Sequence, residues 1–277
     1  MNVVVKLQGG LGNQMFQYAF GKNISNITNR KLILDLSFLN RRDLEPDFVY
    51  RNYDLDIFNL GELSIVDSYN KDCYLISENF DPNSTVESIN SLIKEITERT
   101  DDTIYLDGYW ASPQYFNKID FNFNEKCLRQ SNDLLKDIQN TNSVMLNIRR
   151  TDFLSNDFHG TYGKEYILKG IDKLKSEFTN LSFYIFSDDI EWCENNLSDI
   201  PNSIIVNHEH KGDKFYNYLF LMTQCKHFII PNSTFAWWAA YLSKSENKKV
   251  LYPEIWLNAF SSECKMLYFG LDWEKNS

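Results

Sequence analysis

The chain has 277 residues, of which 43% are hydrophobic and 15% aromatic, and its formal net charge is −10. This length exceeds a typical domain of roughly 100–150 residues and allows two hydrophobic cores. The acidic balance argues against a nucleic-acid-binding protein, because such proteins carry basic stripes. No apolar stretch approaches the roughly 20 residues of a membrane span.

The cysteines and the N-terminus indicate the compartment. Five scattered cysteines contain no CxxC pair: Cys73, Cys127, Cys193, Cys225 and Cys264. They fit neither a zinc pattern nor a disulfide framework, so we expect a reducing compartment. The chain opens on the strand-like run 3–7 without signal-peptide architecture. We therefore expect a cytoplasmic protein, at most peripherally associated with the inner face of the membrane.

The N-terminal half begins as a β-α-β unit. The apolar run 3–7 predicts a buried strand, and glycines at 9–12 predict a turn. Helical spacing of apolar residues predicts a helix over 13–23, followed by a short strand over 32–34. A further strand is predicted over 104–110, ending at a loop of functional character.

A second α/β series follows a connection that we place between 116 and 143, where Asn, Asp and Lys are frequent. Strands that alternate with helices predict parallel sheets. We expect an α/β, GT-B-like fold of two facing Rossmann-like domains with mainly parallel sheets, comprising residues 1–140 and 141–277. The predicted strands of this series are 144–148, 183–186, 204–206, 228–230 and 250–252, and its predicted helices are 164–178, 214–224 and 234–242.

Two adjacent arginines follow the predicted strand 144–148. Arg149 and Arg150, with Asp152 close behind, stand at the carboxyl end of a strand, where α/β domains usually bind ligands. Guanidinium groups match phosphate oxygens and keep their charge near neutral pH. The segment indicates an anion site in an acidic protein, while salt bridges to surface acids are an equally good interpretation.

The glycine turn of the first β-α unit has two interpretations. Gly9, Gly10 and Gly12 allow close backbone approach and precede a helix N-terminus, which suits an anionic or polar ligand. Neither a P-loop nor the dinucleotide fingerprint is present. A tight β-α turn explains the glycines equally well, although Asn13 and Gln14 add polar side chains that packing alone does not need.

Small polar residues open the predicted helix 234–242. Asn232, Ser233 and Thr234 follow the strand 228–230. One hydroxyl is explained by an ordinary N-cap, and the group also suits a phosphate at a helix N-terminus. The cap and ligand roles are compatible.

Acidic residues and one histidine complete the candidates. Asp188 and Asp189 follow the strand 183–186 and suit a metal pair, the N1 and N2 donors of guanine, or a helix N-cap. His159 stands in a loop that should face the same cleft, although a lone histidine is usually structural. The Asp54-Leu55-Asp56 segment mimics the Asp-x-Asp of metal-dependent sugar transferases, and we interpret it as a coincidence.

Taken together, five segments resemble the bacterial α-1,2-fucosyltransferase family, glycosyltransferase family 11. They occur in family order across nearly the whole chain. The segments are Leu7-Gln8-Gly9-Gly10-Leu11-Gly12-Asn13-Gln14-Met15-Phe16-Gln17-Tyr18-Ala19, Gly108-Tyr109-Trp110, Ile148-Arg149-Arg150-Thr151-Asp152, Phe186-Ser187-Asp188-Asp189 and Asn232-Ser233-Thr234-Phe235-Ala236-Trp237-Trp238.

The resemblance implies a GT-B fold and inverting transfer of L-fucose from GDP-fucose to a glycan hydroxyl, commonly the 2-OH of a galactoside. It implies no required metal or other cofactor. The acceptor would be an oligosaccharide or a lipid-linked glycan.

The resemblance also implies roles for the residues named above. The C-terminal domain would bind the donor, with Arg149 and Arg150 on the diphosphate and Asp188 on guanine. The N-terminal domain would face the acceptor. The other donor-binding candidates are Asn147, Asn232, Ser233 and Thr234, and the cleft candidates are Gly9, Gly10, Gly12, Asn13, Gln14 and Trp110.

One departure from the family pattern affects the mechanism. Asn147 stands where the His-x-Arg-Arg-x-Asp motif has histidine, so this side chain cannot titrate. The candidate bases are Asp152, Asp157 and His159, and Arg149 supplies charge to the leaving group. Two alternatives stay open: an inverting transferase for another nucleotide sugar, and a catalytically silent nucleotide-sugar or glycan-binding protein.

Overall fold

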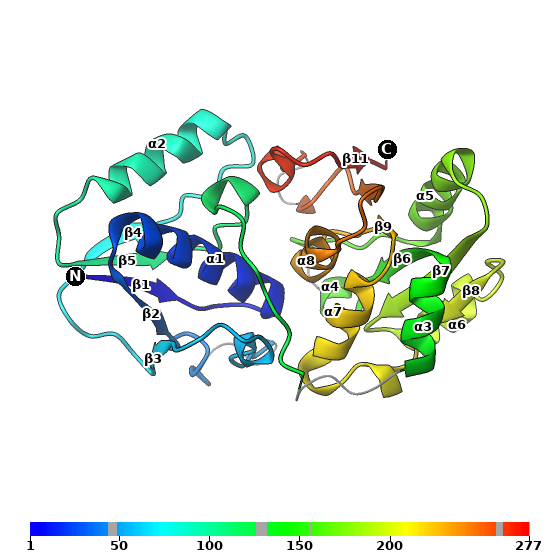
Figure 1. Cartoon of the computed structure of the whole chain (residues 1–277), viewed down its shortest axis with the longest axis horizontal. Coiled ribbons are helices and arrows are strands. Elements are labelled where there is room, and N and C mark those ends of the chain that lie inside the picture. The colour runs from blue at the N-terminus through cyan, green and yellow to red at the C-terminus, as the bar shows by residue number, and fades with distance from the viewer. Residues whose placement is uncertain (44–48, 126–131, 156, 259–262, 277) are drawn as a thin grey trace. The chain divides into compact units, whose positions relative to one another are not determined.

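A computed structural model describes residues 1–43, 49–125, 132–155, 157–258 and 263–276 of the chain (Figure 1). Its contacts divide the chain into two compact units. Unit 1 comprises Met1–Asn122 and Cys264–Leu271, and unit 2 comprises Phe123–Glu263 and Asp272–Ser277. Each unit has its own parallel sheet.

The sheet of unit 1 has five parallel strands in the order β3-β2-β1-β5-β4. The central strand β1 contains a run of three valines that is completely buried, as the continuous apolar pattern predicts for a strand covered on both faces. The strands are β1 (Asn2–Lys6), β2 (Lys31–Asp35), β3 (Ser64–Val66), β4 (Tyr74–Ser77) and β5 (Thr103–Asp107).

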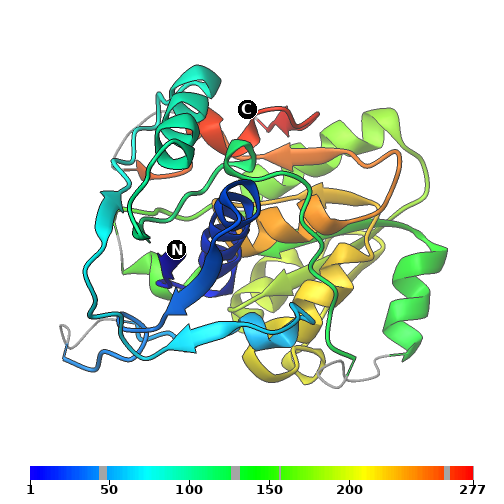
Figure 2. The same ribbon diagram turned by 60° about the vertical axis from the view of Figure 1, so that its left-hand side comes forward.

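Helix α1 (Leu11–Thr28) connects β1 to β2 and packs on both strands (Figures 1 and 2). Helix α2 (Val86–Thr97) begins with a capping box in which Thr85 and Ser88 exchange hydrogen bonds. The described part of unit 1 also contains the short 3-10 helices η1 (Leu55–Ile57), η2 (Pro113–Tyr115) and η6 (Lys265–Tyr268).

The sheet of unit 2 has six parallel strands in the order β11-β10-β9-β6-β7-β8. Strand β6 is central and pairs with β7 over its whole length, from Asn142 opposite Leu181 to Ile148 opposite Ser187. The strands are β6 (Asn142–Ile148), β7 (Leu181–Ser187), β8 (Ser203–Ile205), β9 (His227–Ile229), β10 (Val250–Tyr252) and β11 (Glu274–Lys275).

The helices of unit 2 surround this sheet (Figure 1). Apolar residues of α5 and α6 pack with β6 and β7 in one core cluster. The helices are α3 (Asn132–Asn140), α4 (Thr151–Leu154), α5 (Lys164–Glu177), α6 (Ile190–Leu197), α7 (Tyr216–Thr223) and α8 (Thr234–Leu242), with the 3-10 turns η3 (His208–His210) and η4 (Asp213–Phe215).

The expected α/β class with parallel sheets is confirmed, and the predicted helix 234–242 and strand 250–252 match residue for residue. The predicted strand 104–110 ends earlier, at Asp107, because Trp110 has a positive φ of 54° and the chain turns there. The compact units also differ from a boundary at residue 140. Helix α3 lies within unit 2, and the chain returns to unit 1 over residues 264–271.

None of the described helices combines the length and the apolar composition that a membrane-spanning helix requires. Four of the five cysteines are described, and all four are free thiols. Cys127 lies outside the described residues.

Candidate active site

The predicted cationic segment lies at the switch point of the second sheet. The chain extends from β6 through β7 to β8 on one side and through β9, β10 and β11 on the other. Ligands of open α/β sheets bind outside the carboxyl ends of the strands at such a point. Arg149 follows β6 there, and Asn232 follows the neighbouring strand β9.

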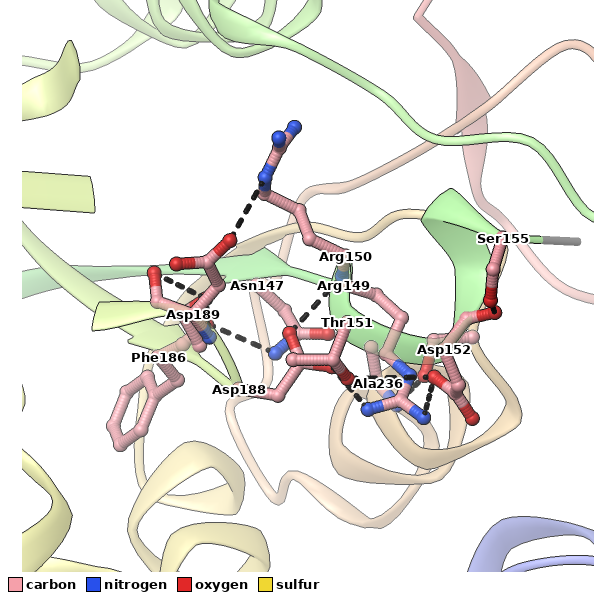
Figure 3. A network of polar contacts seen from close by, with 12 residues as sticks. Asn147, Arg149, Arg150, Thr151, Asp152, Ser155, Phe186, Asp188, Asp189 and Ala236 are labelled. Atoms are coloured by element: carbon pink, nitrogen blue, oxygen red, sulfur yellow. Dashed lines mark hydrogen bonds and ion pairs between the residues drawn. The ribbon is translucent and has the colours of Figure 1, made fainter. Parts of the chain in front are cut away.

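The guanidinium of Arg149 lies between two carboxylates. Its Nη1 is bonded to Oδ2 of Asp188, which follows β7, and its Nη2 to Oδ1 of Asp152 in the short helix α4 (Figure 3). The side chain of Arg149 is about one-quarter exposed, and the ring of Phe153 lies 5.1 Å from the guanidinium carbon. Arg149 is therefore held by acids from two segments that are far apart in the sequence.

Arg150 has different partners and points in a different direction (Figure 3). Its Nε donates to Oδ2 of Asp189 over 3.2 Å, and its guanidinium lies 4.3 Å above the ring of Trp192 in α6. Its two terminal amino groups make no hydrogen bond to any residue that the structure describes. The sequence prediction treated the two arginines as one cationic pair, whereas each has its own acidic partner in the fold.

Asp188 holds three donors of the cationic segment. Its Oδ1 accepts from the backbone N–H of Arg150 over 3.0 Å, and its Oδ2 accepts from Arg149 and from the hydroxyl of Thr151. Strand register explains these contacts of Asp188. Ile148 and Ser187 are paired at the ends of β6 and β7, so the residues that follow them, Arg149 and Asp188, lie side by side. The predicted guanine-binding carboxylate is thus engaged in positioning the arginines. Asp189 instead caps α6 by accepting from the N–H of Trp192.

Asn147 also links the two strand ends. Its side chain is buried, and its Nδ2 donates 3.1 Å to the carbonyl of Phe186 on β7. The residue predicted to bind the donor therefore has a contact within the sheet.

The segment after β9 contacts the loop that carries His159. The Nδ2 of buried Asn232 donates to the carbonyls of His159 (2.8 Å) and Trp256 (3.1 Å), and its Oδ1 is buried with no partner among the described residues. Ser233 is the N-cap of α8 and accepts from the N–H of Ala236, so the predicted capping role is confirmed. Thr234 is the first residue of the helix and is partly exposed.

His159 lies at the edge of this network. Its ring stacks on Phe153 with a centroid distance of 4.3 Å. Burial lowers its pKa, the charge of Asp152 raises it, and the charge of Arg149 lowers it again. The net shift is downward, so the imidazole is neutral at pH 7 and can accept a proton. Asp157, the third predicted base, is exposed.

The glycine turn of unit 1 is clamped by two glutamines. Gly9 has φ +75°, and a side chain there would collide with Asn13. Gln14 is fully buried and bonds to Gly9 O, Asn52 O and the N–H of Asp54. Gln17 bonds to both backbone groups of Gln8. Gln17 was not among the predicted site residues, and the signal that the sequence offers for it is a polar side chain within the apolar run Met15–Phe20.

The other predicted cleft residues occupy different environments. Gly10 is the N-cap of α1 and has open space beside its Cα, while Gly12 is buried in the first turn. Asn13 is partly exposed. Trp110 is completely buried against Phe20, and Tyr109 is the exposed aromatic of its turn.

The described part of the chain contains no group of three or more His, Cys, Asp or Glu side chains arranged to hold a metal ion. The Asp-x-Asp segment at 54–56 runs into the 3-10 helix η1. The carboxylates of Asp152, Asp188 and Asp189, which follow β6 and β7, pair with the guanidinium groups of Arg149 and Arg150.

Comparison with known proteins places the chain in a family. The profile described as "Glycosyl transferase family 11" matches residues 85–274, more than two-thirds of the chain. The chain belongs to glycosyltransferase family 11. It is 31% identical to an alpha-1,2-colitosyltransferase of Escherichia coli over 93% of this chain and 95% of that protein. It is 30% identical to the O-antigen biosynthesis glycosyltransferase WbnK of Escherichia coli, covering 90% of this chain and 93% of that one.

Solved fucosyltransferases share the fold of this family 11 member. The structure of fucosyltransferase NodZ from Bradyrhizobium superposes with a TM-score of 0.53 at 15% identity, covering 87% of this chain and 92% of that one. The likeness supports the predicted GT-B-like fold class, with one parallel α/β sheet in each unit.

Proposed function

We propose that this glycosyltransferase moves L-fucose from GDP-fucose to a hydroxyl of a glycan acceptor with inversion, the 2-OH of a galactoside being the preferred target. The observation that carries the proposal is the arginine segment at the switch point of the second sheet of a family 11 chain. NodZ, which shares the fold, has been crystallised with GDP and soaked with GDP-fucose. Unit 2 is then the donor unit and unit 1 the acceptor unit.

The proposed chemistry starts with the departing GDP. Its diphosphate takes the place of a carboxylate on Arg149, with Arg150, Ser233 and Thr234 as further donors. Fixed cationic donors of this kind are commonly worth a few kcal/mol, about 10²–10³ in rate. Asp152 loses a cationic partner in this exchange. It and the neutral His159 are the candidates for accepting the proton of the attacking hydroxyl.

A second donor has specific support. The E. coli relative at 31% identity is named for colitose, the 3-deoxy counterpart of L-fucose. Transfer from GDP-colitose places the same demands on Arg149 and Arg150, because both donors leave as GDP. GDP-fucose and GDP-colitose differ only in the 3-hydroxyl of the sugar, so selection between them depends on contacts to that hydroxyl.

The test is a transfer assay with GDP-fucose, GDP-colitose, GDP-mannose and UDP-sugars against a panel of galactosides, beside thermal-shift titration with GDP. We expect GDP to raise the melting temperature of the protein. We also expect either GDP-fucose or GDP-colitose to be consumed in the transfer assay. Turnover with a UDP-sugar alone would contradict the proposal. GDP binding without hydrolysis or transfer of any donor would support a silent binding protein instead.

A further inference from the structure

The carboxyl edge of the first sheet carries an ion pair at its own switch point. The strand order reverses between β1 and β5, because β2 and β3 lie on one side of this pair and β4 lies beyond β5. Lys6 ends β1, and its Nζ lies 2.8 and 2.7 Å from the two carboxylate oxygens of Asp107, which ends β5. Both side chains are partly exposed, so the pair is accessible at the position where such sheets bind ligands.

An exposed tyrosine follows this ion pair. Tyr109 is 43% exposed, whereas the next residue, Trp110, is fully buried and anchors the turn against Phe20 at 4.6 Å. Partial burial raises the pKa of the Tyr109 phenol, and the charges of Glu78 and Asp107 raise it further. The hydroxyl therefore remains a hydrogen-bond donor at neutral pH.

The turn itself is fixed by a carboxylate from the neighbouring strand. Glu78 follows β4, and its Oε2 accepts from the backbone N–H groups of Tyr109 (2.6 Å) and Trp110 (3.0 Å). Gly108 permits this approach, because a side chain there would lie 2.3 Å from the Cβ of Glu78. Oε1 of Glu78 and Nε1 of Trp110 are buried without a partner among the described residues. The turn is thus held in one conformation, with Tyr109 on its outside.

We propose that Asp107 and Tyr109 bind a sugar ring of the acceptor, and that Glu78 is a positioning residue that fixes the turn carrying Tyr109. The inference rests on the proposed function, because it names where the acceptor of that reaction is held. Glu78 directly follows β4, Asp107 ends β5, and Tyr109 lies in the turn after β5, all within unit 1.

The chemistry of a pyranose fits these groups. A β-galactoside has one face of C–H groups, which packs on an exposed aromatic ring, and a rim of hydroxyls. Tyrosine combines an apolar ring with a polar tip and suits such an amphipathic surface. The oxygens of Asp107 keep lone pairs beyond those used by Lys6 and accept charge-assisted hydrogen bonds from sugar hydroxyls. A few placed polar groups of this kind orient a ligand.

The first experiment separates acceptor binding from donor use in the full chain. We expect Tyr109→Ala and Asp107→Asn each to raise the KM for a galactoside about tenfold, which corresponds to about 1.4 kcal/mol. The KM for the GDP-sugar and its slow hydrolysis in the absence of acceptor stay unchanged. Tyr74→Ala is the matched control. Tyr74 is also an exposed tyrosine, but it begins β4 and therefore lies at the amino edge of the sheet, away from the carboxyl edge that holds Asp107.

The second experiment tests the positioning role of Glu78. In Glu78→Gln the amide oxygen still accepts from both backbone N–H groups, so we expect an acceptor KM within about threefold of wild type. In Glu78→Ala the turn loses its support, and the acceptor KM rises about as much as in Tyr109→Ala. Equal effects of the two Glu78 variants would overturn the positioning role.

The third experiment measures galactoside binding directly, without any transfer of the donor sugar. Saturation-transfer NMR with lactose and methyl β-D-galactoside should show ring-proton signals with the wild type and with Tyr74→Ala, and lose them with Tyr109→Ala. Signals that persist in Tyr109→Ala, or that no galactoside gives with the wild type, contradict the inference. Failure of the proposed function looks different, because then GDP does not bind or no GDP-sugar is hydrolysed or transferred by the wild type.

Discussion

At the scale of single residues, Arg149 shows how the fold positions a charge. Its guanidinium bridges Asp152 and Asp188, which are 3 and 39 residues away in the sequence. Two carboxylates on one arginine leave this part of the site with a formal charge of −1. In the proposed reaction a diphosphate would replace one carboxylate on the guanidinium, and the other carboxylate would keep the guanidinium oriented.

We expect Arg149→Ala to lower transfer by about 10²–10³ while the chain stays folded, because a fixed cationic donor to the leaving group is lost. We expect the transfer rate of Arg149→Lys to be only slightly higher than that of Arg149→Ala, because an ammonium group lacks the planar, bidentate geometry of a guanidinium. Steady-state rates and circular dichroism measure the two parts of this prediction. Arg41→Ala, which breaks the exposed ion pair with Asp43, is the control. Near-normal turnover of a folded Arg149→Ala protein would remove the central assignment.

The network also predicts how Asp188 acts. Because both of its oxygens hold the arginine segment, we expect Asp188→Asn to weaken GDP and IDP binding by similar factors. IDP lacks the 2-amino group of guanine, so a carboxylate that binds guanine would discriminate between the two nucleotides. Isothermal titration calorimetry of GDP and IDP binding to the wild type and to Asp188→Asn distinguishes the two roles. Selective loss of GDP affinity would restore the guanine-binding role.

At the scale of elements, one histidine ring connects three segments of the second sheet. The Nε2 of His227 on β9 lies 3.2 Å from the side-chain oxygen of Asn142 on β6, and its Nδ1 accepts from the N–H of Lys249 just before β10. This pattern requires a neutral ring with the proton on Nε2. Burial and the charge of Lys226 lower the pKa of His227, while Glu177 opposes the shift.

A lowered histidine pKa makes the stability depend on pH in a definite direction. The unfolded chain takes up a proton as the pH falls below about 6.5, and the folded chain resists it, so stability present at higher pH is lost. We expect urea unfolding of the wild type to show a larger loss between pH 7.5 and 5.5 than His227→Gln. Both proteins retain His159, whose pKa is also lowered. Identical pH profiles would show that His227 contributes nothing.

At the scale of the whole molecule, each sheet places its polar residues at the switch point of its strand order. In unit 2 these residues are the arginines and their acids, and in unit 1 they are Lys6, Asp107 and the turn after β5. Each unit thereby has one candidate ligand site, which agrees with a reaction that needs a donor and an acceptor.

We also propose that the reaction needs no metal, since Arg149 and Arg150 are positioned to supply positive charge to the leaving diphosphate in the proposed donor site. EDTA should then leave the transfer rate unchanged, with or without added Mg²⁺ or Mn²⁺. The measurement is the initial rate of GDP release after dialysis against the chelator. Strict dependence on either cation would point to metal chemistry instead.

Apolar periodicity and local motifs are properties of neighbouring residues, so the alternation of strands and helices and the family were predictable from the sequence alone. It also placed Arg149, Asp188 and Asn232 at strand ends. It did not indicate β4, which is only four residues long, or the box that caps α2, which consists of two small polar residues, Thr85 and Ser88. The acidic partner of each arginine, and the burial of Trp110 beside an exposed Tyr109, became visible only in the folded chain. Those contacts join segments separated by tens of residues, and they depend on strand register and on one left-handed turn.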